Sequence, residues 1–377
     1  MMSATNSFNC DKCSKTYKNS SSLKRHILQK HEIPEIPIQL EQQPPLVHSF
    51  IEVCSGAGGL SKGLILAGFN PILLNDNNAD CCATLRRNHQ NHPNIIIRHD
   101  SMTNLDLTEY RGRIDLLCGG VPCQSFSHAG KRGGLADPRG DLMLRFADLI
   151  RQVSPKIFMI ENVKGLLSHA EGATLERIIE HLNVDGQYNI VYKLLNAVNY
   201  GVPQKRERVF IIGIKRIYER EFVFPVINPD EPIKTVSDAL LDVPDSPGAS
   251  YSQVKLRLYP MIPQGGCWVD LPEDEQRAYL GASINSGGGK RGILHRLAMD
   301  KPALTLLCTP TQKQTERCHP LEDRPLRVRE YARIQSFPDN YEFCGSMASQ
   351  YKQIGNAVPV ELARRMGAAL LEYLQQL

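Results

Sequence analysis

The sequence FIEVCSGAGG at residues 50–59 is typical of a strand that runs into a tight turn. The apolar strand extends from Phe50 to Cys54, the glycine-rich turn follows, and a helical pattern begins near Ser61 and ends near Ala67. Further strand-like segments alternate with helical stretches: Pro71–Leu74, Ile95–Ile97, Ile114–Cys118, Ile157–Ile160 and Val209–Ile214. This alternation predicts an α/β fold with a mostly parallel sheet that helices cover on both faces.

The glycine turn also predicts a cofactor site. A turn of this kind lets a cofactor approach the backbone at the start of a helix, and an acid about 20 residues later can hold a ribose diol. Gly56, Gly58 and Gly59 supply the turn, and Asp76 lies at that distance. A nicotinamide dehydrogenase has the same spacing, and Asp76 also fits a solvated carboxylate at a strand end. The turn alone therefore does not identify the cofactor.

The composition is that of an ordinary soluble protein, with 42% hydrophobic and 22% charged residues among 377. No window approaches eighteen uninterrupted apolar residues, and the first residues lack an apolar signal core. We therefore expect no membrane association and an intracellular location, cytoplasmic or nuclear. Eleven cysteines in a chain of this length indicate reduced thiols, which can act as metal ligands or nucleophiles.

Two cysteines and two histidines near the N-terminus have the spacing of a tetrahedral zinc site. Two residues separate Cys10 from Cys13, and twelve more lie before His26. Four residues separate His26 from His31. Residues 1–31 resemble a Cys2His2 zinc finger, a small ββα unit whose folding energy comes from binding Zn²⁺.

The predicted finger is strongly basic. It carries six Lys or Arg side chains against Asp11, whereas the whole chain has a net charge of only +4, so a DNA cleft elsewhere must be a local cluster of charge. If its helix reads DNA, Asn19, Ser22 and Arg25 would face successive bases; phosphate anchoring and contact with a protein are equal alternatives. Residues 32–48 contain four prolines and no amphipathic period, which predicts an extended linker.

A candidate nucleophile lies in the sequence GGVPCQSFS, residues 119–127, directly after a predicted strand. Its cysteine is Cys123. At the carboxyl edge of a parallel sheet, and flanked by Pro and Gly, such a cysteine is held out of the core beside the ligand crevice. We therefore predict that Cys123 is a reactive thiol.

From about Phe50 to the C-terminus the chain resembles the C5-cytosine DNA methyltransferases of the bacterial modification type. Six motifs occur in the family's order: the glycine turn at 55–59, PCQ at 122–124, ENV at 161–163, QKRER at 204–208, RPL to QSFP at 324–338, and QIGNAVP at 353–359. The resemblance implies a Rossmann-like domain that binds S-adenosylmethionine, and a smaller irregular target-recognition domain. It also implies methyl transfer to carbon 5 of cytosine in a specific duplex DNA sequence.

The resemblance assigns the chemistry to four side chains. Carbon 5 of cytosine is too poor a nucleophile to attack a sulfonium methyl unaided, so the Cys123 thiolate first adds at carbon 6. Glu161 would contact N3 and the exocyclic amine of the base. Arg208 would contact its O2, and Arg206 would lie in the same pocket or on the nearby backbone. The base must leave the duplex stack. Gln124, Ser125 and Ser127 belong to the loop expected to close over it. Lys131 and Arg132 are available to contact phosphates, and solvated loop charges are an equal alternative for these two.

The cofactor residues implied by the resemblance are the turn glycines, two acids at strand ends and two residues near the C-terminus: Gly56, Gly58, Gly59, Asp76, Asp100, Asn356 and Val358. Asp76 would hold the ribose, and Asp100 would lie near the adenine amine. Glu52 and Cys54 stand where the family usually has Asp and Phe. The longer acid can still cap the amides of the turn, but the usual aromatic contact with adenine is lost.

The strand and helix rhythm is lost between Ile217 and His319. We therefore expect a catalytic domain at 49–216, the target-recognition domain at 217–344 and a return to the catalytic domain at 345–377. Phosphate contacts are expected from basic residues of the recognition domain: Lys290, Arg291, Arg296, Lys313 and Arg317.

The compact nucleophile loop and the full recognition segment resemble modification enzymes that accompany restriction endonucleases. This implies double-stranded DNA as the substrate, a companion endonuclease and a monomer on DNA. Three alternatives stay open. A tRNA cytosine-5 methyltransferase of the same superfamily should carry a Cys-Phe-Thr signature, which is absent. A non-catalytic DNA-binding regulator should have lost a reacting group, and a dehydrogenase has no use for the nucleophile loop.

Overall fold

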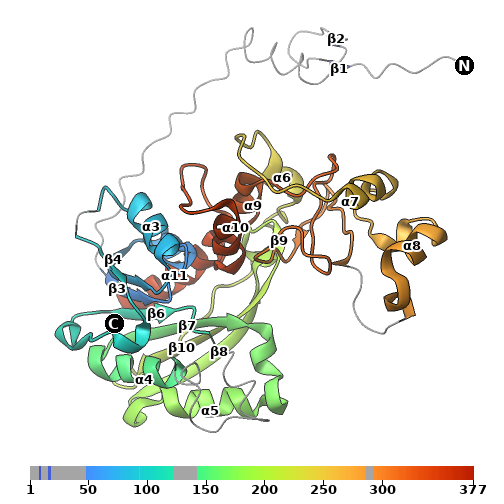
Figure 1. Cartoon of the computed structure of the whole chain (residues 1–377). Coiled ribbons are helices and arrows are strands. Elements are labelled where there is room, and N and C mark those ends of the chain that lie inside the picture. The colour runs from blue at the N-terminus through green and yellow to red at the C-terminus, as the bar shows by residue number, and fades with distance from the viewer. Residues whose placement is uncertain (1–7, 10–15, 18–47, 93, 123–141, 286–291) are drawn as a thin grey trace, which may run out of the picture. The chain divides into compact units, whose positions relative to one another are not determined.

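The computed structural model of the 377-residue chain describes residues 8–9, 16–17, 48–92, 94–122, 142–285 and 292–377 (Figure 1). The chain forms two compact units, Met1–Pro44 and Pro45–Leu377. In the first unit, β1 (Phe8–Asn9) pairs antiparallel with β2 (Thr16–Tyr17). All other described elements belong to the second unit.

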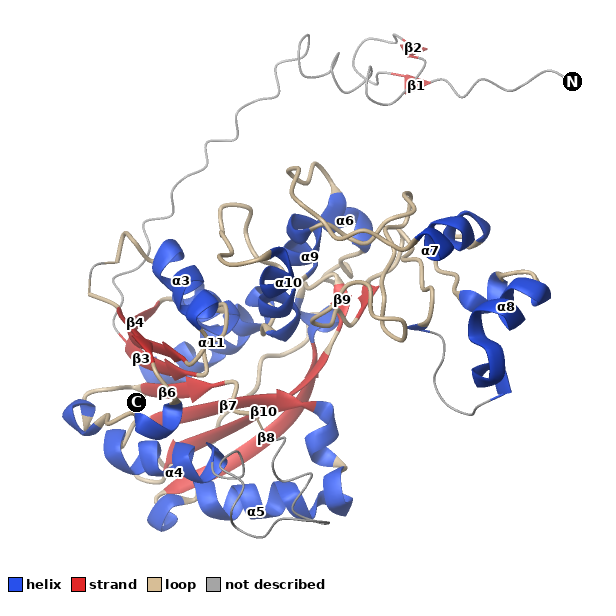
Figure 2. Cartoon of the chain, viewed as in Figure 1, coloured by secondary structure: helices blue, strands red, loops and turns tan. Residues whose placement is uncertain are grey.

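A seven-stranded sheet runs through the second unit in the order β5-β4-β3-β6-β7-β10-β8 (Figure 2). Its strands are β3 (His48–Val53), β4 (Phe69–Asp76), β5 (Ile96–His99), β6 (Leu116–Gly119), β7 (Ile157–Val163), β8 (Tyr188–Asn196) and β10 (Glu207–Lys215). The strands from β5 to β7 are parallel, and β10 is antiparallel to both β7 and β8. The predicted α/β fold is confirmed, and each predicted strand segment forms a strand. The pattern did not predict β8, an edge strand whose middle is exposed at Val191 and Tyr192.

Helices cover both faces of the sheet. On one face lie α2 (Gly59–Ala67), α3 (Ala79–Asn88) and α11 (Val360–Gln375). On the other lie α4 (Leu142–Val153) and α5 (Ala173–Leu182). Among the helices of the described ranges, none is long and apolar enough to cross a membrane.

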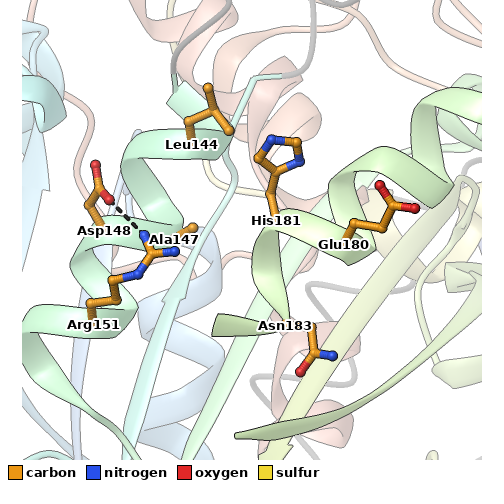
Figure 3. Close-up of a pocket in the computed structure, with 7 residues that line it drawn as sticks. All are labelled: Leu144, Ala147, Asp148, Arg151, Glu180, His181 and Asn183. Atoms are coloured by element: carbon orange, nitrogen blue, oxygen red, sulfur yellow. Dashed lines mark hydrogen bonds and ion pairs between the residues drawn. The ribbon is translucent and has the colours of Figure 1, made fainter. Parts of the chain in front are cut away.

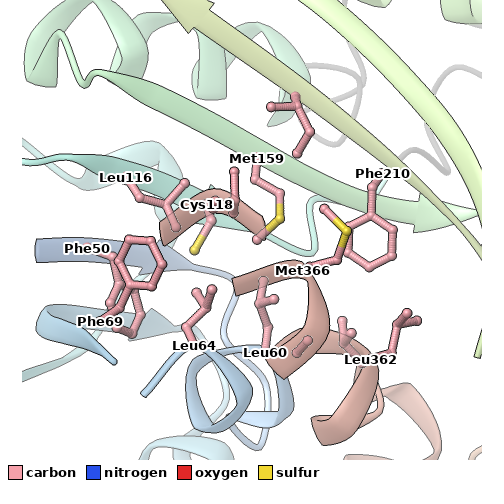
Figure 4. Packing of buried hydrophobic residues seen from close by; sticks show 14 of the residues in the cluster. Phe50, Leu60, Leu64, Phe69, Leu116, Cys118, Met159, Phe210, Leu362 and Met366 are labelled. Atoms are coloured by element: carbon pink, nitrogen blue, oxygen red, sulfur yellow. The ribbon is translucent and has the colours of Figure 1, made fainter. Parts of the chain in front are cut away.

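The C-terminal helix α11 packs into the core that β3, α2 and β4 form. Its apolar residues recur at helical spacing, which gives it one buried face. In this core Leu64 of α2 and Met366 of α11 pack beside Phe50 and Phe210 of the sheet (Figure 4). The last segment of the chain therefore supports the strand that leads into the glycine turn.

The region after β10 is irregular, as predicted. It contains the short helices α6 (Val236–Leu240), α7 (Gln253–Leu258) and α8 (Glu273–Leu280). Its strand β11 (Ala303–Leu304) pairs in parallel with β9 (Gln204–Lys205), which lies just before β10 in the chain. Helices α9 (Val328–Ile334) and α10 (Met347–Asn356) follow and share a core with α6. The division at 216 and 344 stays a prediction, since Pro45–Leu377 forms one compact unit.

Candidate active site

A cavity of about 580 Å³ lies at the carboxyl ends of the parallel strands. The chain winds from β3 to β4 and β5 in one direction and from β6 to β7 in the other, so the winding reverses between β3 and β6. Open α/β sheets bind ligands at such a reversal. The cavity is lined by strand ends, the loops that follow them and α10, including Glu52, Gly56, Asp76, Pro122, Glu161 and Asn356.

The glycine turn between β3 and α2 uses left-handed backbone. Cys54, Gly56 and Gly58 have φ angles of 53°, 55° and 81°. Gly56 lines the cavity, and its N–H donates to Oδ2 of Asp76 at 2.8 Å. A Cβ on Gly56 would meet nothing within 4 Å, so a ligand can approach its backbone closely.

The other two predicted glycines do not line the cavity and instead allow close packing. A Cβ on Gly59 would lie 2.3 Å from the carbonyl oxygen of Val358, and one on Gly58 would lie 2.6 Å from the hydroxyl oxygen of Tyr341. Tyr341 donates this hydroxyl to the carbonyl of Ala57 at 2.6 Å. The C-terminal segment therefore forms the back of the turn, and Gly59 lets Val358 reach the cavity.

The two predicted acids differ in position. Asp76 lines the cavity, and its Oδ1 accepts the N–H of Asn78 at 2.8 Å. Asp100 is not among the residues that line it. Its Oδ1 accepts from the N–H of Ser101 and from Nδ2 of Asn104, and Ser101 contributes to the cavity instead. The structure thus brings Asp76, but not Asp100, to the candidate cofactor site.

Among the described residues, one oxygen of the buried Glu52 carboxyl group lacks a hydrogen-bond partner, which indicates the kind of ligand that fits the cavity. Glu52 is 1% exposed, and its Oε2 has no hydrogen-bond partner in the described part of the chain. Burial raises its pKa to about 8. Burial also raises the pKa of the Cys54 thiol to about 12. The free carboxyl oxygen, the open backbone at Gly56 and the carboxylate of Asp76 fit a ligand with amino and hydroxyl groups, as S-adenosylmethionine has.

Glu161, which lines the cavity, forms a largely buried ion pair with Arg208. They lie on the antiparallel neighbours β7 and β10, where Arg208 is opposite Val163. Nε of Arg208 lies 2.8 Å from Oε1 of Glu161, and the side chains are 13% and 11% exposed. Burial raises the pKa of Glu161, and the positive charges of Arg208 and Arg206 oppose this shift. The pair therefore places a carboxyl group of raised pKa beside a fixed cation.

Arg206 occupies a different place from Arg208. It is 1% exposed, and its guanidinium donates to the carbonyls of Leu306, Gly355 and Ala357 at 2.9 to 3.1 Å. Burial lowers its pKa to about 9. Arg206 is not among the residues that line the cavity. It joins the segment at Leu306 to the QIGNAVP segment, and its predicted part in the reaction stays a prediction.

Cys123, the predicted nucleophile, lies outside the described residues, and so do the other residues expected in its loop: Gln124, Ser125, Ser127, Lys131 and Arg132. A hydrogen bond fixes the segment just before Cys123. Nδ2 of Asn162 donates to the carbonyl of Val121 at 2.9 Å, and Val121 and Pro122 line the cavity. Asn162 follows Glu161, so one strand end supplies both the acid and the support for this segment.

Two of the five basic residues expected to contact phosphates, Arg296 and Arg317, are buried. Arg296 is 5% exposed and donates to four backbone carbonyls, and Arg317 is 7% exposed. Their burial corrects the prediction that they contact phosphates, because both lie inside the fold. Lys313 is exposed. Lys290 and Arg291 lie outside the described residues.

The predicted zinc ligands Cys10, Cys13, His26 and His31 also lie outside the described residues. Within the described ranges, no group of three or more His, Cys, Asp or Glu side chains could hold a metal ion.

A second hollow, of about 370 Å³, lies between α4 and α5 (Figure 3). Asp148 and Arg151 pair on its α4 side at 2.8 Å, and Glu180 and His181 come from α5. It shares no lining residue with the larger cavity and contains none of the predicted site residues. The candidate active site is therefore the larger cavity.

The site and the order of its motifs agree with one protein family. Residues 48–372 match the profile of the C-5 cytosine-specific DNA methylases. The chain therefore belongs to this family of S-adenosylmethionine-dependent DNA cytosine-5 methyltransferases. This membership confirms the enzyme class that the motifs predicted.

Similar proteins support the same assignment. The Type II methyltransferase M.PspPI of Psychrobacter sp. (strain TA137) is 46% identical over 343 residues, which cover 89% of this chain and 82% of that protein. M.Eco47II of Escherichia coli is 44% identical over 338 residues, covering 88% and 80%. The crystal structure of S. pombe Dnmt2 methyltransferase has the same fold, with a TM-score of 0.62 at 18% identity, over 87% of this chain and 99% of that one.

Proposed function

We propose that this enzyme methylates carbon 5 of a cytosine flipped out of a specific duplex DNA sequence, with Cys123 as the covalent nucleophile and S-adenosylmethionine as the methyl donor. One observation carries the proposal: Glu161, which is paired with Arg208, and Gly56 of the glycine turn line the same cavity. A group suited to a base and groups suited to a cofactor therefore share one cavity, as direct transfer of a methyl group requires.

The reaction begins at the thiol. The Cys123 thiolate adds to carbon 6 of the cytosine, and the new carbon–sulfur bond makes carbon 5 enamine-like. S-adenosylmethionine, when bound, supplies the methyl group from its sulfonium centre. After carbon 5 is methylated, a base removes its proton. The electrons of that C–H bond restore the double bond between carbons 5 and 6 and expel the thiolate.

Glu161 and Arg208 would hold the base during this addition. Burial raises the pKa of Glu161, so its carboxyl takes up a proton more readily than a free glutamate does and can share it with N3, which offsets the charge that builds up on the ring. Arg208 fixes Oε1 of Glu161 through its Nε, which leaves further N–H groups of the guanidinium for O2 of the base. The two side chains would act as one unit.

The cofactor would be held by both sides of the cavity. Gly56 leaves room at the turn, Asp76 offers a carboxylate to the ribose, and Glu52 has a free carboxyl oxygen. Asn356 and Val358 line the opposite, C-terminal part. Gly58, Gly59 and Asp100 would act indirectly, by shaping the turn and the loop beside it.

Bisulfite sequencing tests the activity, the target base and the recognition sequence together. We expect unmodified DNA incubated with the protein and S-adenosylmethionine to gain protected cytosines at one sequence. Cys123→Ala should abolish the product, and a wild-type rate from this variant would refute the mechanism. Methyl groups entering tRNA and not DNA would instead favour the tRNA-modifying alternative.

The biological role proposed is protection of DNA in restriction and modification. The relatives that are 44–46% identical are named Type II methyltransferases, and the chain has the recognition region that such sequence specificity needs. The proposed partners are duplex DNA and a companion endonuclease, with the enzyme acting as a monomer. Plasmid DNA from cells that make the protein should resist endonucleases that cut the sequence found by bisulfite analysis.

We also infer that residues 1–31 form a Cys2His2 zinc finger around Zn²⁺. The antiparallel pair supports this, because Phe8 lies opposite Tyr17 and the two strands bracket both cysteines in the sequence, as a zinc knuckle requires. Elemental analysis should find about one zinc ion per wild-type chain and none in Cys10→Ala. Cys10→Ala should keep methyl transfer. A wild-type protein free of zinc would exclude the finger.

A further inference from the structure

A thiol from the recognition region contacts the cofactor side of the cavity. Sγ of Cys308 lies 2.9 Å from Oδ1 of Asn356. Cys308 follows β11, whereas Asn356 ends α10 and lines the cavity. The sequence motifs assign no role to Cys308.

The backbone holds the two residues in register. A Cβ on Gly355 would lie 2.4 Å from the carbonyl oxygen of Leu307, so the two segments touch directly. Arg206 bonds the carbonyls of both Leu306 and Gly355. The backbone just before Cys308 is thus joined to the backbone just before Asn356. The side chains of Cys308 and Asn356 therefore meet in a fixed geometry.

The hydrogen bond from Cys308 determines which way the side-chain amide of Asn356 faces. Burial raises the pKa of the Cys308 thiol, so the sulfur keeps its proton and donates it to Oδ1 of Asn356. The NH₂ group of Asn356 then lies on the other side of its amide, and the side chain is exposed at the cavity. Lys352, one helical turn earlier, lines the same side. This end of α10 thus offers N–H donors and a positive charge, which suit a carboxylate.

We propose that Cys308 is a positioning residue for the cofactor: it turns the Asn356 amide so that the NH₂ group donates to the carboxylate of S-adenosylmethionine. This role rests on the proposed function. It also ties the end of the recognition region to the cofactor pocket.

Binding of S-adenosylmethionine, measured by calorimetry without DNA, tests this role. Cys308→Ala removes the donor and should raise Kd roughly fivefold, as the loss of one hydrogen bond does. Cys308→Ser keeps a donor and should bind within about twofold of wild type. KM for S-adenosylmethionine should rise with Kd in Cys308→Ala, while kcat at saturating cofactor stays the same. Cys344→Ala, which removes a half-buried thiol outside the cavity lining, is the matched control and should match wild type.

A double-mutant cycle separates positioning from general damage. If Cys308 acts through Asn356, Cys308→Ala should add nothing to the weaker binding of Asn356→Ala. Equal Kd for Cys308→Ala and wild type, equal weakening in the Ser and Ala variants, or additive losses in the cycle would each overturn the proposal. If the wild-type protein binds S-adenosylmethionine and transfers methyl groups, and Cys308→Ala binds the cofactor equally well, only the role of Cys308 is refuted. A wild-type protein that binds no S-adenosylmethionine refutes the proposed function as well.

Discussion

Nε of Arg208 and Oε1 of Glu161 lie 2.8 Å apart between two antiparallel strands, with both side chains almost fully covered. An isolated charge in such a place costs several kcal/mol, and the opposite charge of the partner offsets part of this cost. Oε2 of Glu161 remains on the side of Gly120, whose missing Cβ would lie 3.6 Å away. The pair therefore presents one carboxyl oxygen toward the segment that leads to Cys123.

Replacing Glu161 tests this pair directly. Glu161→Gln keeps the shape of the side chain but cannot exchange a proton with the base, so the rate of methyl transfer should fall about 10²- to 10⁴-fold. Kd for S-adenosylmethionine should stay within about twofold of wild type, since Arg208 and the glycine turn remain. Single-turnover assays and calorimetry measure the two quantities. Glu273→Gln, on the exposed surface of α8, should change neither; a wild-type rate from Glu161→Gln would exclude Glu161 from the chemistry.

Arg206 should matter for stability more than for chemistry. Arg206→Lys keeps the charge but lacks the fork of N–H groups that binds the carbonyls of Leu306, Gly355 and Ala357. We expect the free energy of unfolding to fall by about 2–4 kcal/mol, measured by urea denaturation. The exposed Arg277→Lys should change it by less than about 0.5 kcal/mol. Lost activity with unchanged stability would instead place Arg206 in the reaction.

Glu52 should make stability depend on pH. Its pKa is raised from 4.5 to about 8 in the folded protein, so the folded state keeps a proton that the unfolded state releases between these values. Stability from this group is therefore present at low pH and is lost as pH rises from about 4.5 to 8. Glu52→Gln removes this loss, and its Tm relative to wild type should increase between pH 5 and pH 8, by roughly 2 °C or more. Parallel Tm profiles of the two proteins would contradict the buried, protonated carboxyl.

The sequence predicted the features that depend on local pattern. Runs of apolar, β-branched residues located the strands, and the turn at Gly56 followed from its position after the first of them. The motif order placed Glu161 and Arg208 in one site before their contact could be seen. The parallel strands end at one edge of the sheet, and the antiparallel β10 begins at that edge, so Glu161 at the end of β7 and Arg208 at the start of β10 meet there.

The features that depend on distant partners could not be read from the sequence. Gly58 and Gly59 have the spacing of cofactor glycines, yet their neighbours Tyr341 and Val358 come from the other end of the chain. The arginine side chain of Arg296 could contact a phosphate, but in the fold it donates to backbone carbonyls of residues distant in the sequence and is buried among them. The side-chain type states which bonds a residue can make, and the tertiary fold decides which ones it does make.

The turn offers a final test, because neither Gly59 nor Gly165 has a left-handed backbone, whereas the space around the two differs. A Cβ on Gly59 would lie 2.3 Å from the backbone oxygen of Val358, whereas one on Gly165 would meet nothing within 4 Å. Gly59→Ala must displace the segment that lines the cavity, so we expect a loss of about 1–3 kcal/mol in stability and weaker binding of S-adenosylmethionine. Gly165→Ala should cost less than about 0.5 kcal/mol and leave binding unchanged. If Gly59→Ala bound the cofactor as tightly as Gly165→Ala, the cavity would not depend on how the C-terminal segment packs against the turn.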